Sequence, residues 1–156
     1  MFAGSHVGLV LYRGWQQILR DAFQRIDAIL ARSNCSFHWV CLDEEEGFAR
    51  CLYALGEHSR YVVDVANLSR RATRVVTSDG SKELVPAIDA IILDTERVSG
   101  ETCIVCGARC GQRTEHFGRV LPLCTQHLPE VVNEAGEEGL EGVWRRAILV
   151  EIDRNH

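Results

Sequence analysis

The sequence predicts an α+β fold in which a small, mostly antiparallel sheet is packed by two amphipathic helices. Two segments, residues 16–34 and 84–99, have apolar residues at three- and four-residue steps, which is the spacing of one helix face. Between them lie short runs rich in β-branched and aromatic residues, separated by turn residues. This alternation of long helical and short strand segments favours helices packed on a sheet over an all-helical or all-strand fold.

Length and composition indicate one domain. The chain has 156 residues, 46% of them hydrophobic, which suffices to bury a core in a single domain spanning residues 1–156. No apolar run approaches the roughly 18 residues that cross a bilayer, and the best candidate, residues 88–93, contains Asp89. The seven cysteines are odd in number, and no secretory signal pattern precedes them. We therefore expect a soluble, cytoplasmic protein with reduced thiols.

Residues 16–34 form the first predicted helix, which follows a short apolar run at residues 7–12 and the pair Gly14-Trp15. One side of this helix is apolar and the opposite side is charged. The apolar stripe consists of Ile18, Ala22, Phe23, Ile26, Ile29 and Leu30. We expect the helix to end near Ser33 and Asn34.

Two predicted strands follow as a hairpin. Residues 36–42 place Trp39 and Cys41 on one face and Val40 and Leu42 on the other, so both faces are apolar and a central strand is expected. Residues 48–55 resume as the second strand. A polar turn between them is predicted from Asp43, Glu44, Glu45, Glu46 and Gly47.

Residues 56–80 permit two structures. Their apolar residues fall at helical steps, whereas two segments within them are dense in β-branched residues. We favour two strands joined by a turn at residues 67–71, with a helix as the alternative. A second helix then follows Ser81, carries Pro86 in its first turn and ends near Ser99. Its buried stripe is predicted to be Leu84, Ala87, Ile88, Ile91 and Ile92.

The segment after residue 127 is predicted in three parts. Pro129 is expected to open a short helix through Ala135. Residues 135–142 are rich in glycine and glutamate and are predicted to form a loop. Residues 143–152 are predicted to form a final strand, because apolar β-formers dominate them.

The most specific pattern lies between the second helix and this C-terminal segment. Cys103 and Cys106 are separated by two residues, and so are Cys124 and His127. Each such pair bends the backbone into a tight knuckle whose two side chains point at one ion, with Gly107 supplying a turn. Thiolate and imidazole ligands suit zinc better than calcium or magnesium, and four protein ligands are typical of a structural site.

We therefore predict that residues 103–127 form a zinc-ribbon-like knuckle subsite that holds a structural Zn²⁺. Cys110 and His116 lie between the two pairs and are alternative ligands. Because neither belongs to a pair with a two-residue gap, we place both on the connecting loop.

Charge weighs against general nucleic-acid binding. The formal net charge is −5, whereas affinity for nucleic acid comes mainly from cations that displace counterions from phosphates. Residues 1–78 contain nine basic and eight acidic residues, and residues 79–156 contain eight basic and fourteen acidic residues. The acidic excess therefore lies in the half of the chain that contains the predicted metal site.

The order of these motifs resembles that in a group of small uncharacterised bacterial proteins. Those proteins have a helix led by Gly-Trp, a strand pair, and a helix followed by a CxxCG knuckle and a closing LCxxH or LCxxC knuckle. The corresponding segments here are GWQQILRDAFQRIDAIL, CIVCG and LCTQH. The resemblance implies the same four zinc ligands and no particular activity. Residues 56–80, Cys110 and the strand expected after residue 140 depart from the pattern.

A catalytic centre is not predicted. His38 and Cys41 come closest to a base and nucleophile, but they are three residues apart on one predicted strand and should point to opposite faces. No other convergent set of catalytic groups is evident in the sequence. We therefore predict a non-enzymatic protein.

Two binding functions remain as hypotheses. The first is a bacterial protein-binding module stabilised by zinc, in particular an immunity protein or antitoxin that inhibits a basic toxin. The acidic residues Asp43, Glu44, Glu45 and Glu46 are predicted to bind that partner. The alternative is a zinc-ribbon-like regulator that binds nucleic acid. This alternative requires one shared face for Arg70, Arg71, Arg74, Arg109, Arg113 and Arg119. Neither hypothesis involves a membrane or a small-molecule substrate.

Overall fold

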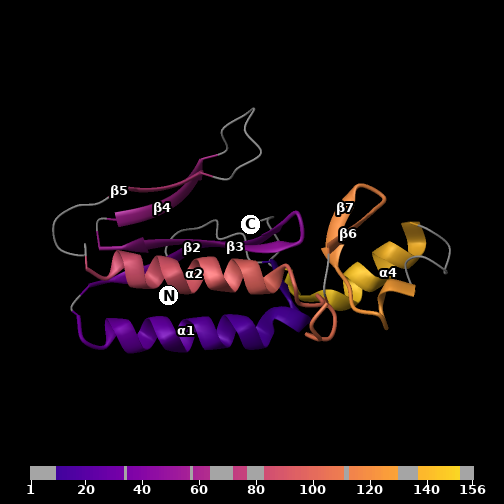
Figure 1. The fold of residues 1–156 in the computed structure, drawn as a ribbon, viewed down its shortest axis with the longest axis horizontal. Coiled ribbons are helices and arrows are strands. Elements are labelled where there is room, and N and C mark those ends of the chain that lie inside the picture. The colour runs from indigo at the N-terminus through magenta and orange to yellow at the C-terminus, as the bar shows by residue number, and fades with distance from the viewer. Residues whose placement is uncertain are drawn as a thin grey trace.

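The elements of the fold are known for residues 10–33, 35–56, 58–63, 72–76, 83–110, 113–129 and 137–151, which the computed structural model describes. In chain order they are β1 Val10–Tyr12, the 3-10 turn η1 Arg13–Trp15, α1 Gln16–Leu30, β2 Phe37–Glu45, β3 Phe48–Leu55, β4 His58–Val63, β5 Ala72–Val76, α2 Val85–Ser99, β6 Arg113–His116, β7 Arg119–Pro122, α4 Glu137–Ala147 and β8 Ile148–Glu151. Helices pack on antiparallel strands, so the predicted α+β class is confirmed (Figure 1).

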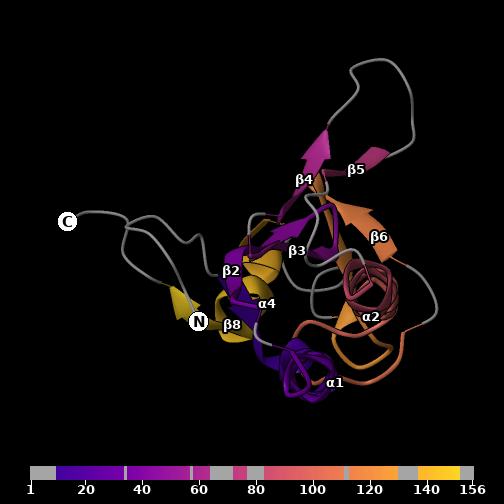
Figure 2. The ribbon, with the colours of Figure 1, turned by 90° about the vertical axis from the view of Figure 1, so that its left-hand side faces the viewer.

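The core lies between the helix pair and the sheet. Helices α1 and α2 run side by side beneath the four-stranded sheet, whose order is β2-β3-β4-β5 (Figures 1 and 2). Phe23 of α1 contacts Trp39 of β2, with ring centroids 5.0 Å apart. The buried residues of this layer include Leu19, Ala22, Ile26, Trp39, Leu42, Cys51, Tyr53, Leu55, Ile88, Ile91 and Ile92. Burial of these side chains is the main source of stability for the helix–sheet layer.

Both predicted helices are present, with small differences. Helix α1 ends at Leu30 rather than near Ser33, because the Ser33 N–H and hydroxyl both donate to the Leu30 carbonyl, at 2.9 and 3.1 Å, and close the last turn. Helix α2 carries Pro86 in its first turn as predicted. Ala87 was expected in the buried stripe but is exposed. Ser81, after which this helix was expected to begin, lies outside the described residues.

Residues 56–80 contain two strands, which confirms the prediction of strands rather than a helix. Strands β4 and β5 pair antiparallel, and the turn predicted at residues 67–71 lies outside the described residues. The expectation that residues 36–42 form a central strand is wrong. Strand β2 lies at one edge of the sheet and, within the described residues, pairs only with β3.

A β-bulge at Val40 changes the faces of β2. The register with β3 shifts at this residue, whose side chain is 41% exposed. As a result, His38 and Cys41 lie opposite Ala54 and Leu52, which are two residues apart on β3 and therefore on the same face. The prediction that His38 and Cys41 point to opposite faces is wrong. Val40 is an extra residue in the bulge, so His38 and Cys41, although three apart in sequence, are spaced along β2 like residues two apart.

The β2–β3 turn is tighter than predicted. Strand β2 continues through Glu45, so only Glu46 and Gly47 form the turn instead of residues 43–47. Their φ angles are 51° and 78°, as a two-residue type I′ turn requires at both positions.

The C-terminal segment differs most from prediction. Helix α4 occupies most of the predicted loop at residues 135–142 and the first half of the strand predicted at residues 143–152. Its buried face consists of Leu140, Val143 and Ala147, at helical spacing. Packing of this face outweighs the cost of two helical glycines, about 1 kcal/mol each relative to alanine. Residues 148–151 do form a strand, β8, which pairs antiparallel with β1.

Two further expectations concern a short helix after Pro129 and the absence of a membrane-spanning segment. The short helix predicted between Pro129 and Ala135 lies mostly outside the described residues. Among the helices that the structure describes, none combines the length and the hydropathy needed to span a membrane.

Candidate metal centre

The first knuckle is a tight loop that follows α2. The Cys103 N–H donates to the Ala108 carbonyl at 2.8 Å, and the Gly107 N–H donates back to the Cys103 carbonyl at 3.0 Å. Gly107 has a φ angle of +77°, which a residue with a side chain adopts only at a cost. These constraints turn the chain within four residues, so that the thiols of Cys103 and Cys106 project to the same side.

The second knuckle follows the β6–β7 hairpin. The N–H groups of His127 and Leu128 both donate to the Cys124 carbonyl, at 3.0 and 2.8 Å. One further hydrogen bond joins the two knuckles, from the Ile104 N–H to the Pro122 carbonyl at 3.1 Å. The hairpin therefore places the second ligand pair against the first.

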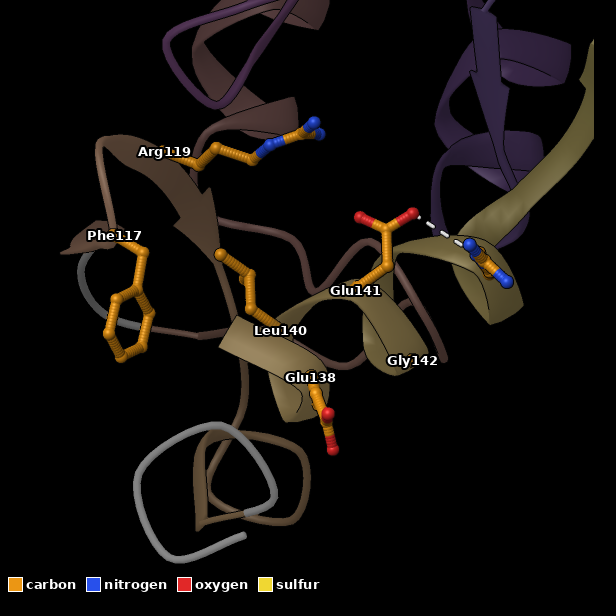
Figure 3. Close-up of a pocket in the computed structure, with 7 residues that line it drawn as sticks. Phe117, Arg119, Glu138, Leu140, Glu141 and Gly142 are labelled. Atoms are coloured by element: carbon orange, nitrogen blue, oxygen red, sulfur yellow. Dashed lines mark hydrogen bonds and ion pairs between the residues drawn. The ribbon is translucent and has the colours of Figure 1, made fainter. Parts of the chain in front are cut away.

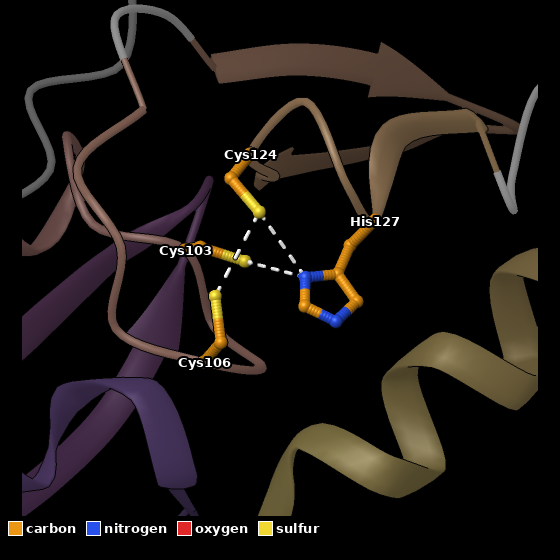
Figure 4. Close-up of side chains that lie close together, drawn as sticks. All are labelled: Cys103, Cys106, Cys124 and His127. Atoms are coloured by element: carbon orange, nitrogen blue, oxygen red, sulfur yellow. Dashed lines mark hydrogen bonds between the residues drawn. The ribbon is translucent and has the colours of Figure 1, made fainter.

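The four predicted ligands converge on one point (Figure 4). Their donor atoms all lie within 4.8 Å of one another. Cys103 Sγ and Cys124 Sγ lie 3.5 and 3.2 Å from His127 Nδ1, and Cys106 Sγ lies 3.7 Å from Cys124 Sγ. This cluster could hold a metal ion, as the spacing of the two pairs predicts.

The protein environment makes one thiol of the cluster acidic. Burial alone would raise the pKa of Cys124, but the backbone N–H groups of His127 and Gln126 stabilise the thiolate, and with the His127 and Cys106 side chains they lower the pKa to about 6. For Cys106, burial raises the pKa to about 11. One thiolate is thus favoured at neutral pH, and a bound cation would favour the others because metals coordinate thiolates.

Cys110 and His116 do not belong to this cluster. Cys110 is buried, burial raises its pKa to about 11, and its N–H donates to the Glu101 carbonyl at 2.7 Å. His116 lies on β6, where its Nε2 is 2.8 Å from the Thr114 hydroxyl. Within the described residues, the cluster of candidate ligands contains only the two predicted pairs.

The turn before α1 packs directly on the first knuckle, a contact that the analysis of separate motifs missed. The Gly14 N–H donates to the Ile104 carbonyl at 2.9 Å, and Trp15 Nε1 donates to the Thr102 carbonyl at 3.1 Å. A Cβ atom on Gly14 would lie 1.8 Å from the Cys103 carbonyl oxygen. Gly14 and Ile104 are far apart in sequence, so no spacing pattern within a segment signalled this contact.

The acidic residues predicted to bind a partner are not equivalent. Glu46 is exposed in the β2–β3 turn, whereas Asp43, Glu44 and Glu45 are half-buried on β2. Glu44 accepts a hydrogen bond from the Gly47 N–H at 2.7 Å and one from the Tyr12 hydroxyl at 3.4 Å. Burial raises the pKa of its carboxyl group. Glu44 thus contributes to folding, whereas the exposed Glu46 contributes to surface charge.

Several arginines that the nucleic-acid alternative requires have intramolecular partners. Arg70 and Arg71 lie outside the described residues. In Arg109, Arg113 and Arg119, an ion pair or an aromatic ring of the same chain places the guanidinium group. Arg109 pairs with Glu101 at 2.8 Å, Arg113 lies 3.5 Å from the centre of the Phe48 ring, and Arg119 lies 4.3 Å from the centre of the Trp144 ring.

Comparison with known proteins gives no relative from which a function for this site can be transferred. No family model matches the chain, and no curated protein or solved structure matches it. The structure does contain the features on which the resemblance rests, namely the Cys/His cluster and a strand pair with helices. Membership of the group itself stays a hypothesis.

Proposed function

We propose that the cluster binds one structural zinc ion and that the metal-stabilised domain acts as a protein-binding module. The observation that carries the metal proposal is the separation of the donor atoms. A tetrahedral zinc ion with ordinary bond lengths separates two sulfur ligands by about 3.8 Å and a sulfur and a nitrogen ligand by about 3.6 Å. The distances of 3.7, 3.5 and 3.2 Å support such a site.

A structural role is favoured over a catalytic one. The donor set supplies three sulfur atoms and one nitrogen atom, which fill a tetrahedron without a position for water or substrate. Both knuckles are also tied to the fold by backbone hydrogen bonds and by the turn at Gly14. A zinc ion there would join the segment after α2 to the segment after the β6–β7 hairpin, and the start of α1 packs on the first of these.

The metal proposal predicts about one zinc ion per chain. Cys124→Ala should lose the ion and much of the stability, because a structural zinc site contributes on the order of 10 kcal/mol of binding free energy to the folded state. Cys110→Ser is the matched control, since Cys110 is a buried cysteine outside the cluster. Elemental analysis of the purified proteins provides the stoichiometry. Loss of zinc from Cys110→Ser, with retention in Cys124→Ala, would show that the ligand assignment is wrong.

A protein is favoured over nucleic acid as the partner. The net charge is −5, and three of the arginines that the nucleic-acid alternative requires, Arg109, Arg113 and Arg119, each contact a carboxylate or an aromatic ring of the same chain. Acidic residues instead suit a basic partner. The narrower hypothesis, an immunity protein or antitoxin that inhibits a basic toxin, stays a prediction.

The partner proposal is tested by capture from the native host with the zinc-loaded chain, followed by titration with duplex DNA and RNA at the same salt concentration. Recovery of a protein partner whose activity falls on binding would support the inhibitor hypothesis. Tight, salt-sensitive nucleic-acid binding without a protein partner would favour the regulator instead.

A further inference from the structure

A pocket separate from the metal cluster lies between the β6–β7 hairpin and α4 (Figure 3). Its volume is about 600 Å³, a size that accommodates a side chain of another protein or a small ligand. It is lined by Phe117, Arg119, Glu138, Leu140, Glu141, Gly142 and Arg145. None of these residues belongs to the candidate metal site.

The most unusual residue of the pocket is Phe117. It occupies the first position of the β6–β7 turn with a φ angle of +50°, and Gly118 follows with +76°. This turn favours asparagine, aspartate or glycine at both positions, and an aromatic residue there is strained. The ring is nevertheless 57% exposed, so it gains little from burial in the fold. An unfavourable conformation that brings an aromatic ring to the surface is more often retained for binding than for stability.

Two further lining residues, Leu140 and Gly142, give the pocket an apolar surface and room for an incoming group. Leu140 is buried at the base of the pocket, beside Phe117 (Figure 3). Gly142 has no atom within 4 Å of the position that a Cβ would take, so this part of α4 leaves room for an incoming group. An aliphatic stem fits such a surface.

Of the charged residues that line the pocket, Glu138 has no ion-pair partner within the described residues. Arg145 pairs with Glu141 at 3.1 Å, and the guanidinium group of Arg119 lies over the Trp144 ring, 4.3 Å from its centre. Glu138 is exposed, and within the described part of the chain no hydrogen bond or ion pair engages it. The pocket therefore combines an unpaired carboxylate, which attracts a cation, with an exposed aromatic ring, on which an aliphatic stem can lie.

We propose that this pocket receives the side chain of a lysine or arginine from the protein partner. The aliphatic stem lies on Leu140 and the Phe117 ring, and the cationic head faces Glu138. This inference rests on the proposed protein-binding function and adds the chemistry of the residue that is recognised.

The test is an NMR titration of the zinc-loaded full chain with acetyl-Gly-Arg-Gly-amide and acetyl-Gly-Lys-Gly-amide. We expect saturable shifts at Phe117, Leu140 and Gly142. The same peptides with Glu or Leu in the centre should produce none. No saturable shift with the basic peptides, or equal shifts with all four, would overturn the proposal. Line broadening that grows with protein concentration alone would overturn it too, because a second copy of the chain would then fill the pocket.

Two variants make the test specific. Phe117→Asn and Glu138→Gln should each weaken binding of the arginine peptide about threefold, as expected for the loss of one exposed apolar contact with the stem or of one exposed ion pair. Glu115→Gln removes an exposed carboxylate of β6 that does not line the pocket, and it should leave binding unchanged. Phe117→Asn should unfold at the same temperature as the parent or higher, because asparagine suits the turn. A lower unfolding temperature would assign Phe117 a structural role and contradict the proposal.

Capture experiments distinguish failure of the pocket from failure of the proposed function. A partner captured equally well by the parent, Phe117→Asn and Glu138→Gln would overturn the pocket and leave the protein-binding function intact. Peptide binding that depends on both residues, with no protein partner captured, would support the pocket and contradict the wider function.

Discussion

Gly14 shows how a single residue can connect the hydrophobic core to the metal centre. Its missing side chain allows the turn before α1 to contact the first knuckle, where a Cβ would lie 1.8 Å from the Cys103 carbonyl oxygen and 2.8 Å from the Gly107 nitrogen. Both neighbours are backbone atoms that hold the knuckle, so they have little freedom to move away. Close approach of two backbones, rather than flexibility, explains glycine at this position.

Gly14→Ala should therefore destabilise the protein strongly. We expect a loss of roughly 3 kcal/mol or more in the free energy of unfolding, because the added methyl group overpacks a rigid contact. Gly142→Ala is the matched control, since its Cβ would meet no atom within 4 Å and alanine favours the helix by about 1 kcal/mol. Urea unfolding of the two variants measures both effects. Equal stability of Gly14→Ala and the parent would contradict the packing of the turn on the knuckle.

At the scale of elements, a chain of polar contacts connects β1, β2 and α4. Trp144 Nε1 donates to the Tyr12 hydroxyl at 3.1 Å, and this hydroxyl donates to Glu44 at 3.4 Å. Burial, followed by the nearby Glu44 charge, raises the pKa of Tyr12. These three side chains are distant in sequence, so their contacts help to hold α4 and β8 against the rest of the fold.

This network predicts a pH dependence of stability. The pKa of the Glu44 carboxyl group is raised in the folded state, chiefly by burial, so folding favours its protonated form. The stabilisation from protonation is complete below the pKa of about 4.3 of an unfolded glutamate and is lost as pH rises through the folded-state pKa. Relative to the parent, Glu44→Gln should therefore gain stability as pH increases through this window.

Urea unfolding at several pH values between about 4 and 7 tests this expectation, with zinc present throughout. The difference between Glu44→Gln and the parent removes contributions that both proteins share, including loss of metal in acid. Glu115→Gln provides a control at an exposed glutamate. A stability difference that does not change with pH would show that Glu44 does not titrate abnormally.

At the scale of the whole molecule, the knuckles lie where distant segments meet, beyond the ends of α2 and the β6–β7 hairpin. The first knuckle contacts Gly14 and Trp15 and is joined to Pro122 of β7. Loss of a bound ion should thus loosen the end of the molecule that contains the hairpin and α4 before the core formed by α1, α2 and the sheet.

Chelation is expected to lower the unfolding temperature by roughly 20 °C or more, because on the order of 10 kcal/mol of metal binding is lost from a chain of this size. The far-UV circular dichroism of the helices should persist at room temperature, whereas the near-UV signal of buried tryptophans such as Trp15 should change. Restored thermal stability after addition of zinc completes the measurement. An unfolding temperature unaffected by chelation would contradict a structural metal.

Charge acts over the whole molecule through its effect on association. If the partner is basic, Glu46→Lys should slow capture roughly twofold to threefold and flatten its salt dependence, because Glu46 is exposed and steering charges are screened beyond about 8 Å at physiological salt. Glu115→Lys, also at an exposed position, tests whether the effect is local. Stopped-flow association with the captured partner provides the rates. Unchanged rates for Glu46→Lys would remove this turn from the binding surface.

The sequence was most informative where the determining pattern is local. Helical periodicity located α1 and α2, and ligand spacing located Cys103, Cys106, Cys124 and His127. It was least informative for α4, because Gly139 and Gly142 suggest a loop and the following apolar residues suggest a strand. Local propensities there amount to about 1 kcal/mol per residue, less than the burial of one large side chain.

By itself, the sequence determined the fold class, the two long helices and the four candidate ligands, because each depends on spacing within a short segment. For residues 56–80 it favoured two strands and left a helix open. Only the tertiary structure decided the bulge at Val40, the contact of Gly14 with the first knuckle, the helix at residues 137–147 and the pocket at Phe117. Each of these depends on a partner distant in sequence, and packing against that partner outweighs the preference of the local segment.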